Sequence, residues 1–125
     1  MLLNTRLHPV LDKYVTSVQF LRLRTVKTRN PDGKEVQLAM LTVWDVHGKK
    51  LKLVDGANPK GSNPAKEGPN QALDGKKDTK WLDRKKGNLE CRIESGFAVV
   101  GRYELMTAND MPHRDPVRWC LEGRG

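Results

Sequence analysis

The chain is built from short runs in which apolar and polar residues alternate, each closed by turn-forming residues. In residues 18–26, Leu21 and Leu23 alternate with Arg22 and Arg24, which predicts a half-buried β-strand with a cationic outer face. Further runs follow at Val36–Trp44, Leu51–Val54, Leu89–Glu94, Val99–Met106 and Val117–Leu121. No stretch has a convincing helical period. Six short strands separated by turns predict an all-β protein, an antiparallel β-sandwich.

Turn chemistry predicts how some of these runs connect. Asn30–Gly33 has the residues of a tight turn, which predicts a hairpin between residues 18–26 and Val36–Trp44. Within the second run the apolar phase moves from even to odd positions between Met40 and Leu41, as a β-bulge requires. The segment from Asp55 to Gln71 is dense in Gly, Pro, Asn and Lys, which predicts a long loop without a core of its own.

Length and charge limit the class of protein. With 125 residues and 37% hydrophobic content, the chain has material for one domain, which we assign to residues 14–125 after an extension at residues 1–13. The net charge of +8 favours an anionic partner, although a solvated basic surface is the alternative. No apolar run approaches the roughly 18 residues of a membrane span, and the first residues do not resemble a secretory signal.

The two cysteines are predicted to be free thiols. Alternation places Cys91 on the apolar face of its run, whereas Cys120 lies on the face opposite Trp119 and Leu121. Side chains that point in opposed directions argue against a disulfide. Free thiols favour a reducing compartment, so the cytoplasm is expected for the chain as given, and the extracellular space if it was cut from a longer precursor.

A series of short segments, in this order, is shared with a known family: Phe20–Arg22, Val36–Leu38, Asp45–Lys49, Asn63–Glu67, Ala72–Gly75, Thr79–Trp81 and Thr107–Asp110. From about Tyr14 onward the chain resembles the discoidin-like, or coagulation-factor type C, domains with the galactose-binding jelly-roll fold. It looks closest to members with a loop similar to Asn109–Pro116 before a strand similar to Trp119–Gly123. Such domains usually continue past that strand. The resemblance therefore implies an incomplete C-terminal edge, which could pair with a strand of a partner chain.

A possible calcium site lies in the turn that contains Asp74 and Thr79. A carboxylate, a glycine turn and a hydroxyl can converge there with main-chain carbonyls, and Ca²⁺ prefers such oxygens. The resemblance implies the Asp74 side chain, the Thr79 oxygen, and carbonyls near Gln71 and Lys76 as ligands of a structural calcium ion.

An alternative role for Asp74 is to cap its own turn by accepting main-chain N–H groups. The positive charge of Lys76, Lys77 and Lys80 favours this alternative. The resemblance also implies a carboxylate ligand on the last strand near Trp119, and tryptophan has no carboxylate, which again favours the capping role.

Candidate ligand-binding residues are Trp44, Asn63, His113, Arg114 and Asp115. Trp44 could stack against a sugar ring, although packing in the core is the alternative. The run from His113 to Asp115 offers a ring donor, a planar cation and a carboxylate that could grip sugar hydroxyls or an anion. The alternative is that Arg114 pairs with Asp115 or Asp110 and so shapes the loop before the last strand. Trp81 and Trp119 are predicted to point into the core.

These residues predict a non-catalytic binding module for carbohydrate. The alternative is a protein-interaction domain that docks on an acidic partner through its lysines and open edge. We expect no enzyme, because no nucleophile, base or carboxylate pair occurs in a catalytic context. Nucleic acid is an unlikely partner, since the lysines from Lys49 to Lys86 are not interleaved with exposed aromatics.

Overall fold

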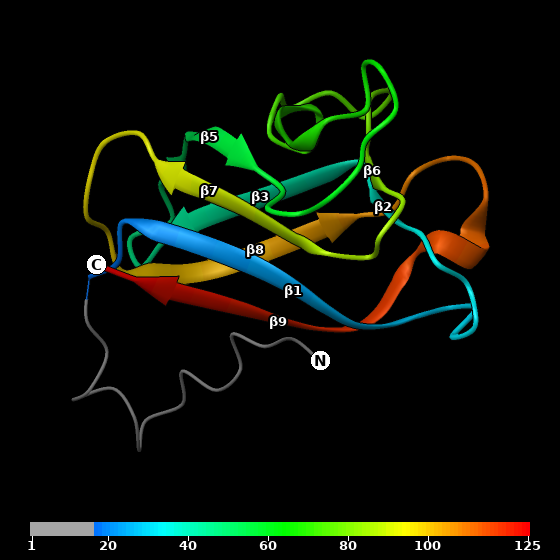
Figure 1. The fold of residues 1–125 in the computed structure, drawn as a ribbon. Helices are drawn as coiled ribbons and strands as arrows, with labels where there is room; N and C mark the ends of the chain where they lie inside the picture. Colours follow the sequence, from blue (N-terminus) through cyan, green and yellow to red (C-terminus); the bar gives the residue numbers. More distant parts are fainter. Residues whose placement is uncertain (1–16) are drawn as a thin grey trace.

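Two antiparallel sheets face each other in residues 17–125, the part of the chain described by the computed structural model (Figure 1). The first sheet has four strands, in the order β5 (Leu53–Ala57), β7 (Asn88–Ile93), β1 (Phe20–Thr28) and β9 (Pro116–Arg124). The second sheet has three, in the order β4 (Lys50–Leu51), β3 (Met40–Asp45) and β8 (Val100–Met106). A short pair joins β2 (Val36–Leu38) to β6 (Trp81–Asp83). The predicted antiparallel β-sandwich is confirmed.

Helical structure in the described residues is confined to loops. Two single-turn 3₁₀ helices, η2 (Pro69–Ala72) and η3 (Pro112–Arg114), precede β6 and β9. Between Ser17 and Gly125 no helix is long and apolar enough to cross a membrane. The expected extension at residues 1–13 lies outside the described residues, as do the first three residues of the expected domain.

The core lies between the two sheets, and strand alternation fills it. Leu21 and Leu23 of β1 point inward, and Arg22 and Arg24 between them are exposed, as the sequence predicted. The fully buried Trp81 is the largest side chain of the core. Other inward residues come from every strand of both main sheets and include Leu41, Val43, Leu51, Leu53, Leu89, Cys91, Ile93, Tyr103, Trp119 and Leu121.

The predicted hairpin between residues 18–26 and Val36–Trp44 is wrong. Strand β1 pairs with β7 and β9 instead, and β2 pairs with β6. Both runs bury apolar faces in the same core, but they reach it from different sheets. Alternation fixes which face of a strand is buried, and it says nothing about which strand lies beside it.

The phase shift in Val36–Trp44 is real, but it lies at Ala39 rather than between Met40 and Leu41. Ala39 is fully buried, and its N–H donates to the Met106 carbonyl over 2.9 Å. Here the chain leaves the small β2–β6 pair and enters the β3–β8 pair. The odd and even phases therefore belong to two strands of different sheets, not to a bulge within one strand.

The C-terminal strand β9 is an edge strand of the four-stranded sheet. It pairs with β1 from Phe20↔Arg124 to Thr28↔Pro116, and no other described strand lies beside it. Its first residue is a proline, and charged side chains occur along the strand. Both features protect the edges of natural sheets from uncontrolled pairing. In Figure 1 it forms the lower border of the front sheet.

Both cysteines are free, as expected. Cys91 points into the core with 4% of its surface exposed, and burial raises the pKa of its thiol to about 12. Cys120 lies half-buried on the opposite side of the sheet, where its sulfur is 3.3 Å from a guanidinium nitrogen of Arg24.

Candidate functional site

Two long loops meet at one end of the sandwich and enclose a polar hollow. The first connects β5 to β6 and contains η2, and the second connects β8 to β9 and contains η3 (Figure 1). The hollow between them, here called the loop hollow, has a volume of about 410 Å³. Its lining comprises Lys66, Glu67, Gln71, Lys77, Asp78, Thr79, Lys80, Ala108, Asn109 and Asp110.

Lys80 joins the two loops to the core beneath them. Its ammonium nitrogen lies 2.9 Å and 3.1 Å from the two carboxylate oxygens of Asp110, and 2.9 Å from the amide oxygen of Gln37. A carboxylate oxygen of Glu67 lies 3.6 Å away. The hydrogen bond from Lys80 holds the pKa of Asp110 below its ordinary value. Both carboxylates on this side of the loop hollow are therefore held in place by one ammonium group.

Gln37 supports the second loop from inside the protein. It is fully buried on β2, and its amide nitrogen donates to the carbonyls of Asp110 over 2.6 Å and of Met111 over 3.1 Å. Met111 has a left-handed backbone with φ of 44°, which few residues other than glycine adopt. The loop between β8 and β9 thus has a defined shape set by a buried side chain.

The sequence pattern does not point to Gln37, and it indicates for Lys80 only a charge that disfavours calcium. The available signal was one polar residue inside the apolar run Val36–Leu38, where every residue is buried. A buried amide needs hydrogen-bond partners, which predicts a polar contact below the surface. The sequence alone does not reveal which distant lysine and carbonyls supply it.

The predicted oxygens of the Asp74 turn do come together. The Thr79 hydroxyl oxygen lies 2.6 Å from a carboxylate oxygen of Asp74, 3.1 Å from the Gln71 carbonyl and 3.4 Å from the Lys76 carbonyl. The other Asp74 oxygen accepts the Lys76 N–H over 2.9 Å, which confirms that Asp74 caps its own turn. These oxygens are of the kind that Ca²⁺ prefers, but both carboxylate oxygens already accept donors of the same turn. Elsewhere in residues 17–125 no cluster of His, Cys, Asp or Glu has the form of a metal site.

Asn63 belongs to a polar network beneath the first loop. Its amide nitrogen donates to Asn58 over 2.8 Å and to the Leu82 carbonyl over 2.7 Å. The Asn58 side chain also accepts from the Trp81 indole nitrogen over 3.2 Å and donates to Asp83 over 3.0 Å. With its amide group used in this way, Asn63 shapes the loop and does not line the loop hollow.

Asp83 anchors the same network. It is fully buried, and it accepts the N–H groups of Ser62, Lys85 and Gly87 over 3.0, 2.9 and 2.6 Å. Burial alone would raise the pKa of Asp83, but these bonds and the one from Asn58 lower it below its ordinary value. The ionised carboxylate is therefore part of the fold.

The residues His113, Arg114 and Asp115 point in different directions. His113 is exposed, Arg114 forms a 3.0 Å ion pair with Glu35, and Asp115 is buried with an oxygen 3.8 Å from Arg29. Desolvation raises the pKa of Asp115, whose other oxygen has no hydrogen-bond partner among the described residues. Arg114 and Asp115 thus form ion pairs that shape the loop before β9, but their partners are Glu35 and Arg29. The expected pair of Arg114 with Asp115 or Asp110 does not form.

Trp44 lies on the outer side of the three-stranded sheet. The guanidinium carbon of Arg102 sits 3.8 Å above its ring, and the two residues are cross-strand partners on β3 and β8. Trp44 is half-buried by this contact. Met40 pairs with Met106, where β8 ends and the second loop begins. Trp44 lies four residues from Met40 along β3, so the structure does not bring it to the loop hollow.

The candidate ligand residues therefore do not form one site, whereas the Asp74 turn borders the loop hollow through Thr79 and Gln71. Comparisons of the chain with protein-family models, with curated proteins and with solved structures found no match.

Proposed function

We propose that this domain is a non-catalytic carbohydrate-binding module whose ligand occupies the loop hollow. The observation that carries the proposal is an open concavity lined by polar side chains, of which Thr79, Lys80 and Asp110 are held by hydrogen bonds. Sugar hydroxyls act as donors and acceptors together, so a site for them needs carboxylates, amides and an ammonium group at defined positions. The loop hollow offers these groups, and Lys80 holds Asp110 in place before a ligand arrives.

The charge of the lining favours a neutral sugar. Three lysines, Lys66, Lys77 and Lys80, are balanced by the carboxylates of Glu67, Asp78 and Asp110. A balanced lining gives no net attraction for a strongly anionic ligand. Among the described residues that line the hollow none is aromatic, so the affinity depends on hydrogen bonds and on shape.

The resemblance to discoidin-like domains adds support. Those domains have a galactose-binding jelly-roll fold, and the loops at one end of such a sandwich are where we expect the ligand. The proposal moves the site from Trp44 and residues 113–115 to the side chains between the two loops. It keeps the function that the sequence suggested and changes the residues that perform it.

A glycan array at about 10 mM and about 150 mM salt tests the proposal. Specific sugar binding through hydrogen bonds should persist at the higher salt, and Asn109→Ala should remove it without changing the thermal melt. Asn109 is exposed and lines the hollow, and the side-chain hydrogen bonds described above for the two loops do not involve it. Signals that vanish at the higher salt, or that survive in Asn109→Ala, would count against a sugar site in the loop hollow.

A further inference from the structure

Lysine and arginine are segregated on this molecule. Five of the nine arginines in residues 17–125 lie on the four-stranded sheet with their side chains on its outer side, here called the arginine face: Arg22, Arg24, Arg92, Arg118 and Arg124. The segment from Asn58 to Lys86 carries seven lysines and one arginine. Arginine presents a planar fork that matches a carboxylate, whereas lysine is a strongly hydrated point charge. The two basic surfaces are therefore suited to different partners.

Strand register arranges the arginine face in rows across the sheet. Phe20 lies between Arg92 and Arg124 in one row, and the guanidinium carbon of Arg124 is 4.4 Å from the centre of its ring. In the next row on this face, Arg22 lies between Glu90 and Glu122. This gives one row with two cations, followed by a row of mixed charge. In the first row Arg92 is paired with Asp55 of β5 over 2.8 Å.

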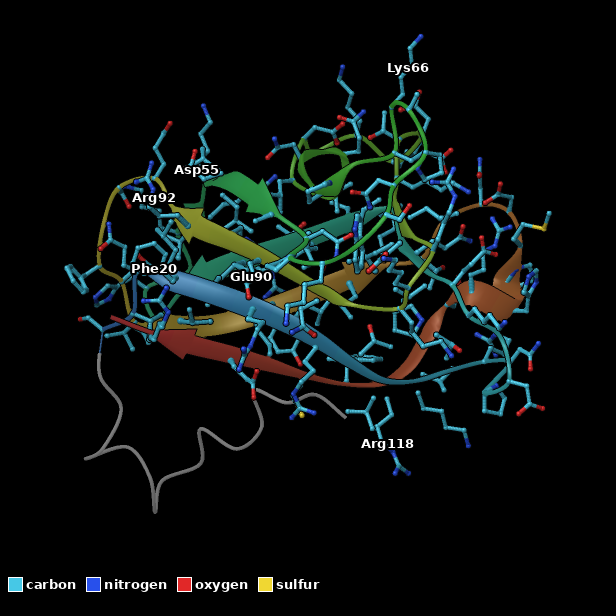
Figure 2. All side chains as sticks on the ribbon, viewed as in Figure 1. Phe20, Asp55, Lys66, Glu90, Arg92 and Arg118 are labelled. Atoms are coloured by element: carbon cyan, nitrogen blue, oxygen red, sulfur yellow. The ribbon has the colours of Figure 1, made fainter. Side chains whose placement is uncertain are left out.

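The third row is cationic again. Arg24 lies between Asn88 and Cys120, and a nitrogen of its side chain is 3.6 Å from Glu122 in the row before. Arg118 follows on β9, where it pairs with Lys27. Figure 2 shows Phe20, Glu90 and Arg92 on the front sheet, with Arg118 projecting from its lower border.

A shallow groove of about 180 Å³ crosses the arginine face. Phe20, Arg22, Arg124 and the two glutamates of the mixed row line it. The central Arg22 is already paired with Glu122 over 2.8 Å. Of the two arginines that line the groove, Arg124 forms no ion pair within residues 17–125 and remains for a ligand.

We infer that the arginine face docks an extended acidic segment of another polypeptide. Rows on one face are two residues apart along a strand, about 6.6 Å, which is also the same-face repeat of an extended peptide. Carboxylates four residues apart in such a peptide meet the Phe20 row and the Arg24 row. The residue between them meets the mixed row and is neutral or basic.

The mixed row distinguishes a peptide from a uniform polyanion. Consecutive phosphates or sulfates would bring a negative group over Glu90 and Glu122, and like charges placed face to face are unfavourable. A polypeptide can place serine or lysine at that point. The sequence suggested an acidic partner for the lysines. The arginines suit an acidic partner better than the lysines do, because a guanidinium group can bind a carboxylate through two hydrogen bonds.

The test uses a fluorescein-labelled peptide built from repeats of Asp-Thr-Ser-Thr, and a matched peptide in which Asn replaces Asp. Fluorescence anisotropy should rise with the acidic peptide and not with its neutral match. In the double variant Arg24→Ala/Arg124→Ala the affinity should fall about tenfold, because each of the two cationic rows loses a charge-assisted contact. The control Lys76→Ala/Lys77→Ala removes the same charge from the loop end and should change the affinity less than about twofold.

A conservative variant separates folding from recognition. Arg24→Lys/Arg124→Lys keeps the charge of the sheet, and it should still weaken binding several-fold because the fork is lost. No anisotropy change with the acidic peptide, or an equal loss in the lysine control, overturns the inference. So does tighter binding of a heparin fragment or of single-stranded DNA that depends on the same arginines. None of these results depends on whether a sugar binds the loop hollow.

Discussion

The ammonium group of Lys80 lies 2.9 Å from a carboxylate oxygen of Asp110, although the two residues are 30 positions apart in the chain. This ion pair joins the loop that precedes β6 to the loop that precedes β9. Lys80 is also held by the buried amide of Gln37, so the pair is tied to the core and only 18% of the lysine side chain is exposed. The two walls of the loop hollow are positioned by the same contact.

Replacing Lys80 with methionine should therefore damage both stability and binding. The change leaves the Gln37 amide oxygen without its donor, and an unsatisfied buried polar group costs about 1–3 kcal/mol. Urea unfolding measures this loss. The control is Lys77→Met, an exposed lysine of the same loop, for which a change within about 0.5 kcal/mol is expected. Equal stability of the two variants would show that Lys80 does not hold the loops together.

Trp81→Ala should unfold the domain or bring it close to unfolding. Trp81 is fully buried, and truncation of a buried aromatic residue costs roughly 3–5 kcal/mol. The indole nitrogen also donates to Asn58, so the network under the first loop loses a partner. Trp44→Ala is the matched control, because that ring is half-buried on the outside of a sheet and should cost less. A thermal melt of Trp81→Ala that matches the wild type would refute its place in the core.

The two buried aspartates should respond to pH in opposite ways. Hydrogen bonds lower the pKa of Asp83 in the folded state, so its stabilisation is present above the unfolded pKa of about 3.9 and is lost as the pH falls through the folded value. Burial raises the pKa of Asp115, so its contribution is fully present below the unfolded pKa and is lost as the pH rises through the folded value.

Asparagine variants expose this difference. At pH near 7, Asp83→Asn should destabilise the fold by about 1–3 kcal/mol, because the main-chain N–H groups of Ser62 and Gly87 lose a charged acceptor. Asp115→Asn should be neutral or stabilising at the same pH, since it removes a poorly paired buried charge. The effect of Asp83→Asn should shrink as the pH is lowered below about 4. Urea melts across this range measure both variants, and a destabilised Asp115→Asn at neutral pH would reverse the assignment.

A chelator should change the melting temperature little. The Asp74 turn is closed by its own hydrogen bonds to Lys76 and Thr79, which stabilise it without a metal ion. A calcium ion present at a hundredfold excess over its Kd would contribute about 2.7 kcal/mol, and its removal would lower the melting temperature by roughly 10 °C. A drop of that size on adding EDTA would show that the four oxygens hold calcium.

The sequence predicted the class of fold because alternation carries direct information about burial. Leu21, Leu23 and Cys91 point inward as their spacing indicated, and the turn at His47–Gly48 forms with Gly48 at a positive φ of 84°. The pairing of β1 was wrong because its neighbours, β7 and β9, lie far along the chain. No local signal specifies partners at that separation.

The candidate site was harder to predict. Arg114 and Asp115 were singled out as ligand residues, yet their charges pair with Glu35 and Arg29. Lys80 was read only as a charge that disfavours calcium, because its role depends on Gln37 and Asp110, which reach it from other parts of the chain. The Asp74 carboxylate and the Thr79 hydroxyl do converge with main-chain carbonyls, as their spacing predicted, because all of these oxygens lie within one short segment.

Amide NMR spectra recorded during titration with the strongest glycan from the array provide the decisive test of the loop hollow. The peaks that move should belong to the two loops, with Gln71, Thr79, Asn109 and Asp110 among the largest changes. The amide peaks of the strands that form the arginine face should not shift. Shifts centred on Trp44 and Arg102, or on β1 and β9, with the loops unchanged, would show that the sugar site lies elsewhere.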